Sequence, residues 1–310
     1  MPEALKSVRD LMPAAAGWLE GKGVPSARLN AERLLGHVLG LSRLELYLHH
    51  DRPLTSGELE RFRELLRRRG AGEPLQTLIG EQEFYSRPFR VEPGVFIPRP
   101  ETETLVERCV ALLTEGTSRL IAPVALDLCC GSGVVGLSLA AEIPALSVWA
   151  TDINPAAVRL TEANAHRLGV APRVVCLAGH LADPLPARLA GQVDLLVSNP
   201  PYVRRDEIDS LPVEVSRHDP REALDGGPDG LGFYRALGAL GRRWLRPGGW
   251  LAVEIGADQD TEVCGILDRG GWVGTAMTRD LAGRPRVVTA RRASEEGPPP
   301  AGGDTPVPGG

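Results

Sequence analysis

The sequence predicts an α/β protein in which a small N-terminal helical domain precedes a parallel sheet. Short apolar, β-branched runs at residues 124–128, 147–152 and 193–197 alternate with helical segments, as is typical of strands buried on both faces. Residues up to about Arg69 show a helical pattern instead. With 310 residues, of which 43% are hydrophobic and 24% charged, the chain can bury one large core and one small one.

Two patterns predict helices in the N-terminal region. Thr55 and Glu58 have the spacing of a capping box, which predicts a helix that runs to Arg69. A bundle of this size is too small to hold a nucleoside site alone, so we expect it to bind a partner; the alternative is a cap that only stabilises the larger domain. One apolar helical stripe is expected from Leu29, Leu34, Leu35, Val38 and Leu39.

The chain is expected to divide into four segments. Residues 1–72 form the helical domain, and the alternating pattern in residues 73–98 predicts a β-hairpin linker. Strands and helices alternate through residues 99–292, which form the α/β domain. Residues 293–310 are rich in Pro and Gly and are expected to be disordered.

The strand at residues 193–197 ends in the tetrad Asn199-Pro200-Pro201-Tyr202. The prolines end the strand because they lack an N–H, and they restrict the residue before them to extended geometry. An amide side chain, a proline carbonyl and an aromatic face then lie where open α/β sheets bind ligands. They suit a flat group with an NH2, whose hydrogens two acceptors bind while Tyr202 stacks on its plane. The alternative is a strand-ending loop with a packing tyrosine.

A glycine-containing turn follows the strand at residues 124–128 and leads into a helix. This arrangement places backbone N–H groups and a helix N-terminus beside a ligand. The next strand ends in Asp152, about twenty residues after the glycines, where a carboxylate can bind both ribose hydroxyls. The sequence therefore predicts a nucleoside pocket.

Two nucleoside cofactors fit this pocket. Gly131, Gly133 and Gly136 spell the dinucleotide fingerprint G-x-G-x-x-G, so a dehydrogenase is one interpretation. Asp127 lies just before the turn, where its carboxylate can bind the amino group of a methionine moiety. The tetrad has no role in hydride transfer. These two features favour S-adenosylmethionine over a dinucleotide.

The motifs resemble those of the PrmC/HemK family of protein-(glutamine-N5) methyltransferases, which methylate the Gly-Gly-Gln glutamine of class I peptide chain release factors. The resemblance extends from the helical N-terminus to about Arg292. It rests on residues 72–75, 84–86, 93–103, 199–202, 223–231 and 254–256 with Gln259, and 280–288. The tetrad is shared with adenine and cytosine amino-methyltransferases that act on DNA, whereas residues 97–103 are more specific to the family.

The resemblance implies a Rossmann-like class I methyltransferase domain in residues 99–292 and substrate recognition by residues 1–72. It implies S-adenosyl-L-methionine as cofactor and S-adenosyl-L-homocysteine as product. The expected catalytic residues are Asn199, Pro200 and Tyr202, with Pro201 as a further substrate contact. The expected cofactor-binding residues are Phe96, Asp127, Cys129, Cys130, Gly131, Ser132, Gly133, Asp152, Leu181 and Asn199, and Pro98 and Glu101 are expected to help form the pocket wall.

The chain departs from the family pattern at three places. Cys129 replaces the first glycine of the loop, His180 stands where an acidic residue is usual, and Asp219-Pro220 replaces Glu-Pro. The segment 203–230, with Arg221, is expected to cover the site as a lid; a solvated connector is the alternative.

Composition narrows the range of functions. The net charge of −5, and the lack of a long target-recognition insert, argue against a DNA or RNA amino-methyltransferase, the main alternative. A non-catalytic nucleoside-binding module is a second alternative, which retention of the whole tetrad disfavours. Five cysteines without a C-x-x-C motif indicate a reducing cytoplasm, and the six histidines lack metal-binding spacing. We expect a monomer that acts on protein, without nucleic acid, metal or membrane.

Overall fold

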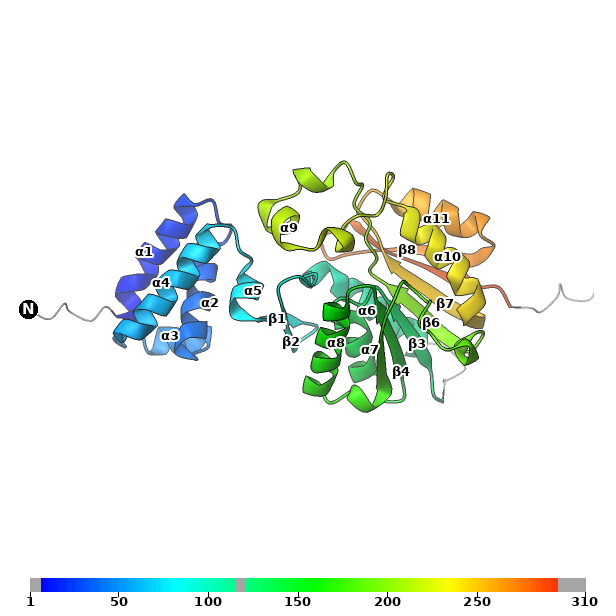
Figure 1. Ribbon diagram of the computed structural model, residues 1–310, viewed down its shortest axis with the longest axis horizontal. Coiled ribbons are helices and arrows are strands. Elements are labelled where there is room, and N and C mark those ends of the chain that lie inside the picture. The colour runs from blue at the N-terminus through cyan, green and yellow to red at the C-terminus, as the bar shows by residue number, and fades with distance from the viewer. Residues whose placement is uncertain (1–6, 115–120, 295–310) are drawn as a thin grey trace, which may run out of the picture.

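The computed structural model describes residues 7–114 and 121–294. A helical bundle lies at one end of the molecule and an α/β domain at the other, with α5 and a β-hairpin between them (Figure 1). The predicted tail, residues 293–310, lies almost wholly outside the described residues. Within the described ranges, no helix has both the length and the apolar character that a membrane span requires.

The helical bundle begins with four helices, three of which start with a capping box. Glu58 accepts a hydrogen bond from the Thr55 backbone N–H at 2.8 Å, and the Thr55 hydroxyl accepts one from the Glu58 N–H at 3.3 Å. The predicted capping box is therefore confirmed. The helices are α1 Val8–Gly21, α2 Ala27–Leu39, α3 Arg43–Leu48 and α4 Ser56–Gly70.

The apolar face of α2 differs from the prediction at one residue. Leu34 and Leu35 are fully buried in the bundle core, whereas Leu29 is 39% exposed. At 3.6 residues per turn, a separation of five residues turns the side chain by about 140°, so Leu29 and Leu34 point in different directions. The prediction that Leu29 belongs to the buried stripe was wrong.

A short helix and a hairpin connect the bundle to the α/β domain. Leu75 and Leu78, on α5 (Leu75–Ile79), pack in the core of the helical bundle. The antiparallel strands β1 (Glu81–Phe84) and β2 (Arg87–Arg90) follow. Phe84 and Phe89 pack edge to face in the core of the α/β domain, so the hairpin is anchored there.

The α/β domain has a seven-stranded sheet of order β5-β4-β3-β6-β7-β9-β8. The first five strands in this order are parallel, and β9 is antiparallel to both of its neighbours. The strand order reverses between β3 and β6, and this is where open α/β sheets bind ligands. The strands are β3 Val124–Leu128, β4 Ser147–Asp152, β5 Val174–Ala178, β6 Val193–Ser198, β7 Leu245–Glu254, β8 Trp272–Arg279 and β9 Pro285–Arg292.

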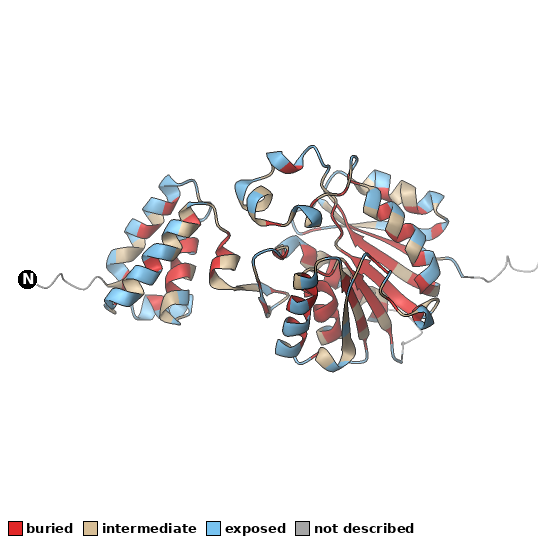
Figure 2. Cartoon of the chain, viewed as in Figure 1, coloured by how far each residue is buried: buried red, intermediate tan, exposed pale blue. Residues whose placement is uncertain are grey.

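Helices cover both faces of this sheet. Neighbouring residues in β3 point to opposite sides: Ala125 packs in one apolar core and Leu126 in the other. Figure 2 shows the central strands buried and the outer faces of the helices exposed. The first core is covered by α6 (Glu103–Thr114), α7 (Val134–Glu142) and α8 (Pro155–Arg167), and the second by α10 (Gly232–Trp244) and α11 (Asp260–Arg269). The structure thus has the predicted α/β fold with a helical N-terminus.

Candidate functional site

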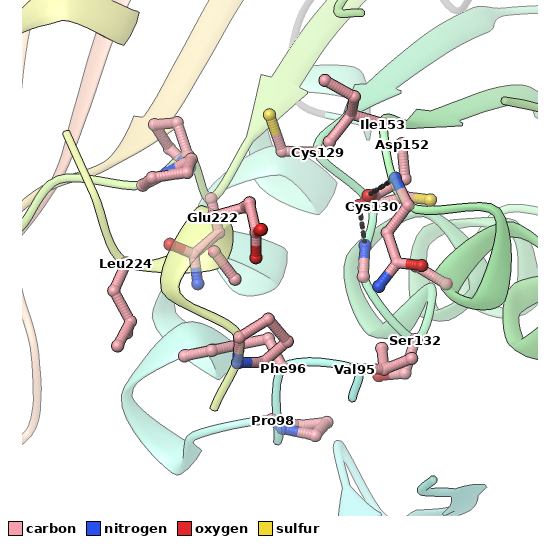
Figure 3. A pocket seen from close by; sticks show the side chains of 18 of the residues that line it. Val95, Phe96, Pro98, Cys129, Cys130, Ser132, Asp152, Ile153, Glu222 and Leu224 are labelled. Atoms are coloured by element: carbon pink, nitrogen blue, oxygen red, sulfur yellow. Dashed lines mark hydrogen bonds between the residues drawn. The ribbon is translucent and has the colours of Figure 1, made fainter. Parts of the chain in front are cut away.

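A pocket of about 920 Å³ lies at the carboxyl ends of β3, β4 and β6. Figure 3 shows Phe96 and Pro98 on one side of it, and Cys129, Cys130 and Asp152 on the other. The structure brings most of the predicted site residues together in its lining: Phe96, Pro98, Asp127, Cys129, Cys130, Gly131, Ser132, Asp152, Leu181 and Asn199, Pro200, Pro201 and Tyr202.

Two predicted pocket residues lie elsewhere. Gly133 immediately precedes α7 with φ +82°, and a Cβ there would lie 2.7 Å from the Thr161 side chain. The positive φ and the close packing against Thr161 explain why the residue at this position is a glycine. Glu101 is exposed, and its neighbour Thr102 lines the pocket instead.

Asp127 ends the buried part of β3 and is only 1% exposed. Its Oδ2 atom accepts a hydrogen bond from the Gly136 N–H at 2.8 Å, which leaves Oδ1 without a partner among the described residues. Burial raises the pKa of this carboxyl to about 7, although the Gly136 N–H acts in the opposite direction. A buried carboxylate with a free oxygen suits a cationic ligand group.

Asp152, at the end of β4, organises the glycine turn. Its carboxylate accepts hydrogen bonds from the N–H groups of Gly131 and Asn154, both at 2.9 Å (Figure 3). Burial raises the pKa of Asp152. Because each carboxylate oxygen can accept more than one hydrogen bond, both oxygens remain able to bind hydroxyls in the pocket.

Two pocket residues adopt a backbone conformation that glycine would favour. Cys129 has φ +62° and Leu181 has φ +44°. For residues with a Cβ, this left-handed region costs about 1–2 kcal/mol, and such strain gathers at functional sites. Cys129, expected from the resemblance to occupy a glycine position, therefore adopts a conformation that glycine favours. All five cysteines are free thiols, and burial strongly raises the pKa of both Cys129 and Cys130.

The tetrad leaves the end of β6 and lies beside β3, because Ser198 is the register partner of Leu128. The Asn199 side chain donates from Nδ2 to the Thr102 hydroxyl at 3.3 Å. The Tyr202 hydroxyl donates to the Glu254 carboxylate at 3.4 Å. The amide oxygen of Asn199 and the pocket-facing side of Tyr202 therefore remain available to a ligand.

The segment 203–230 covers one side of the pocket. It contains the short helix α9 (Val213–His218), and Figure 3 shows its Glu222 and Leu224 among the lining residues. Asp219, which precedes Pro220, is buried and accepts hydrogen bonds from the Arg99 guanidinium at 2.5 Å and the Ile97 N–H at 3.3 Å. Arg221 is paired with Asp209 at 3.1 Å and is absent from the lining.

Sequence reasoning missed several lining residues, among them Thr102, Ile153 and Glu222. Ile153 directly follows Asp152, so an apolar residue beside the acid predicted to bind ribose was an available signal in the sequence. In the structure its side chain is 60% exposed. Thr102 lies within the family motif of residues 97–103, whereas Glu222 has no comparable local signature. Within residues 7–114 and 121–294, no group of three His, Cys, Asp or Glu side chains could hold a metal ion.

Comparisons with known proteins agree with this architecture. Residues 10–80 match the PrmC N-terminal domain, and residues 88–218 match the methyltransferase small domain. A solved structure of the hMettl16 catalytic domain in complex with MAT2A 3'UTR hairpin 6 is similar in fold, with a TM-score of 0.54 and 13% sequence identity. The similarity covers 79% of this chain and 85% of that one.

Two curated relatives are similar over nearly their full lengths. The release factor glutamine methyltransferase of Geobacter sulfurreducens is 40% identical over 285 residues, which are 92% of this chain and 96% of that protein. The one from Moorella thermoacetica is 42% identical over 292 residues, which are 93% of this chain and 100% of that protein. The chain belongs to the family of release factor glutamine methyltransferases.

Proposed function

We propose that this protein transfers a methyl group from S-adenosyl-L-methionine to the side-chain amide nitrogen (N5) of the Gly-Gly-Gln glutamine in class I peptide chain release factors. The observation that carries the proposal is the position of the tetrad. Asn199 and Tyr202 line the same pocket as Asp127 and Asp152, so groups suited to an amide lie beside groups suited to a nucleoside. Family membership supports the same reaction.

The pocket fits S-adenosylmethionine in size and in chemistry. Its volume of about 920 Å³ lies in the range of sites for small ligands. Asp127 would hold the cationic amino group, Asp152 the ribose hydroxyls, and the apolar Phe96, Ile153 and Leu181 side chains the adenine. A Cβ built on Gly131 would meet no atom within 4 Å, so the loop leaves open space at this point. When bound, the donor supplies an electrophilic methyl group on a sulfonium.

The protein's main contribution to the reaction is alignment of the substrate amide. An amide nitrogen is a weak nucleophile because its lone pair is delocalised into the carbonyl. Asn199 Oδ1 and the Pro200 carbonyl would accept the two N–H hydrogens, which orients the nitrogen and favours positive charge developing on it. Tyr202 would stack on the amide plane. No general base is needed before transfer, because the nitrogen proton becomes acidic once the nitrogen is alkylated.

The helical domain, residues 1–72, is the part of the chain that we assign to release-factor recognition. A Gly-Gly-Gln loop alone presents too little surface for a specific protein complex. On α3, the apolar side chains of Leu44 and Leu48 are 68% and 67% exposed, with the half-exposed Tyr47 between them. Neighbouring exposed apolar residues are typical of protein-binding surfaces.

Mass spectrometry of methylated substrates tests this function. The full-length protein, incubated with S-adenosylmethionine and an intact class I release factor, should add 14 Da (one methyl group) to the peptide that contains Gly-Gly-Gln. Fragmentation should place the methyl group on the glutamine side chain. Incubation with DNA or RNA tests the alternative, since labelled methyl groups on adenine or cytosine would contradict the proposal.

A further inference from the structure

The covering segment, residues 203–230, forms one wall of the pocket around a short helix with little packing of its own. α9 has six residues, and none of them is buried. Helices shorter than about 12 residues are marginal in water, and in proteins a buried apolar face usually stabilises them. Yet Leu211, just before α9, and Val215, within it, line the pocket. Contacts with other parts of the chain must therefore fix this wall.

Two carboxylates connect the middle of the covering segment to the rest of the protein. Between residues 206 and 223, Asp219 and Glu214 make the described hydrogen bonds and ion pairs that leave the segment. Asp219, after the C-terminal end of α9, binds the Arg99 guanidinium within the α/β domain. Glu214, within α9, is instead ion-paired with Arg69 at the end of α4. One of the two contacts is thus supplied by the helical domain.

The Arg69 guanidinium is held in place by its own domain. The side chain is only 4% exposed, and it donates from Nε to Asn30 Oδ1 at 2.7 Å and from Nη1 to the Glu73 carbonyl at 2.9 Å. Asn30 is fixed in turn, because its Nδ2 donates to the Pro25 carbonyl at 3.0 Å. Since a guanidinium is planar and rigid, these bonds leave Nη2 directed at Glu214, which accepts its hydrogen bond.

The backbone of the helical domain also approaches α9 closely. Gly72, shortly after Arg69, has φ +100°, and a Cβ built on it would lie 3.3 Å from the Val213 side chain. Figure 1 shows α9 on the side of the α/β domain that faces the helical bundle. The ion pair and this packing contact therefore lie at the same junction between the two parts of the chain.

We propose that the helical domain holds the pocket wall in place through Arg69, and that Glu214 is a positioning residue for methyl transfer. Neither Arg69 nor Glu214 lines the pocket, so both act on the substrate through the neighbouring Leu211 and Val215. The inference rests on the proposed function, but it gives the helical domain a second role besides release-factor recognition. A short peptide substrate needs this second role as much as the intact release factor does.

Loss of the ion pair should let α9 move away from the pocket more often. Asp219 would remain as the other contact, and the helix has no buried residue to hold it. An open wall admits water and leaves the substrate amide less restrained, so its nitrogen is less often aligned for the reaction. Asp127 and Asp152 lie on β3 and β4, away from α9, so donor binding should be largely retained.

Limited proteolysis of the full-length protein tests the position of α9 without any assay of activity. Trypsin cleaves after arginine, and the exposed Arg217 lies within α9. Cleavage within a folded element requires that the element opens locally. Glu214→Ala should speed cleavage after Arg217 by about tenfold, the scale for loss of a hydrogen bond between charged groups. Glu207→Ala removes an exposed acid of the same segment, which is paired with Arg204 at 3.6 Å, and should leave this rate unchanged.

Kinetics with a short Gly-Gly-Gln peptide separate this role from release-factor recognition. Glu214→Ala should lower kcat/KM by about tenfold for the peptide and for the intact release factor alike, because both need the wall. Affinity for S-adenosylhomocysteine, measured by calorimetry, should stay within about twofold. Glu214→Gln keeps an acceptor for Arg69 and should fall between wild type and Glu214→Ala in both cleavage and kinetics.

A double-mutant cycle assigns the effect to the ion pair. In Arg69→Met, Glu214 has already lost its donor, so Glu214→Ala should cause no further rise in cleavage after Arg217. An equal rise with and without Arg69 would contradict the inference. The single Glu214 variants decide the question if Arg69→Met does not fold.

Three further results would overturn the inference. One is a Glu214→Ala protein with wild-type cleavage after Arg217. Another is faster cleavage with unchanged kcat/KM for the peptide, which would indicate a structural role only. The third is a loss confined to the intact release factor, which would place Glu214 in the partner interface. A wild-type protein that fails to methylate the release factor would instead contradict the proposed function, whereas the proteolysis does not depend on that reaction.

Discussion

The guanidinium of Arg69, at the end of α4, is ion-paired with the carboxylate of Glu214 on α9, although 145 positions separate the two residues. The Arg69 side chain is buried and also donates to Asn30 Oδ1 at 2.7 Å and to the Glu73 carbonyl at 2.9 Å. One buried cation thus connects the helical domain to the segment that covers the pocket.

Replacement of Arg69 should destabilise the protein. Arg69→Met leaves the Asn30 side-chain oxygen and the Glu73 carbonyl without their donor. The Glu214 carboxylate is 35% exposed and can be hydrated, so the expected cost is about 1–3 kcal/mol, the scale for buried polar groups left without a partner. Urea unfolding followed by circular dichroism measures the change. Arg67→Met, on the same helix but exposed, should leave the urea midpoint nearly unchanged. Equal midpoints for the two variants would contradict the importance of the buried contact.

The titration of Asp127 should make donor binding depend on pH. Only the ionised carboxylate can bind a cationic amino group, and its pKa of about 7 means that most of it is protonated at pH 6 and ionised at pH 8. Affinity for S-adenosylhomocysteine should therefore rise about tenfold between these two pH values. Calorimetry at each pH measures it. Asp127→Asn, which keeps an acceptor for the Gly136 N–H, should bind more weakly and lose this rise; an unchanged rise would exclude Asp127 as its source.

Asp152 should contribute to donor affinity in two ways. Its carboxylate holds the glycine loop through Gly131 and is placed to accept ribose hydroxyls. Asp152→Ala should weaken binding of S-adenosylmethionine by about 1–3 kcal/mol, the scale for leaving polar groups without a charged partner. Calorimetry tests this, with the exposed Asp183→Ala as control. Binding of a nicotinamide dinucleotide in place of the methyl donor would contradict the assignment of the pocket.

Replacement of Asn199 should lower the rate of methyl transfer and leave the affinity for the methyl donor largely unchanged. Asn199→Ala removes an acceptor that acts mainly in the transition state, so kcat with release factor should fall by about 10²-fold or more. Single-turnover assays with saturating donor measure the chemical step. Donor binding to the variant serves as the internal control for folding. A variant with full activity would remove Asn199 from the set of catalytic residues.

Substitution of the exposed leucines of α3 should change KM for the intact release factor and leave the reaction with a short peptide unchanged. Leu44→Ser combined with Leu48→Ser should raise KM for intact release factor by about tenfold, since loss of interface contacts weakens binding without touching the pocket. The rate with a short Gly-Gly-Gln peptide, already poor, should not change. Ile121→Ser alters an apolar residue that is 93% exposed and precedes the amino end of β3, and it should leave KM unaltered. If both variants behave alike, another surface binds the release factor.

Local sequence patterns determined the elements that carry the site. The strands that end at Leu128, Asp152 and Ser198, the turn at Gly131 and the capping box at Thr55 depend on interactions within a few residues, such as side-chain alternation, the missing N–H of proline and the conformational freedom of glycine. The carboxyl ends of parallel strands lie at one edge of the sheet. The tetrad and the two acids could therefore be assigned to one pocket before the structure was known.

Only the tertiary structure decided what surrounds these groups. Thr102 lies 97 positions from Asn199, and Glu254 lies 52 from Tyr202, yet each pair is in hydrogen-bond contact. Such contacts depend on the strand order and on the path of the connecting segments, which the local pattern of neither partner encodes. The same reason explains why Arg69 meets Glu214 and why Thr102, and not Glu101, lines the pocket. The sequence motifs identified the side chains proposed to take part in the reaction. The packing of distant elements determined which residues contact those side chains.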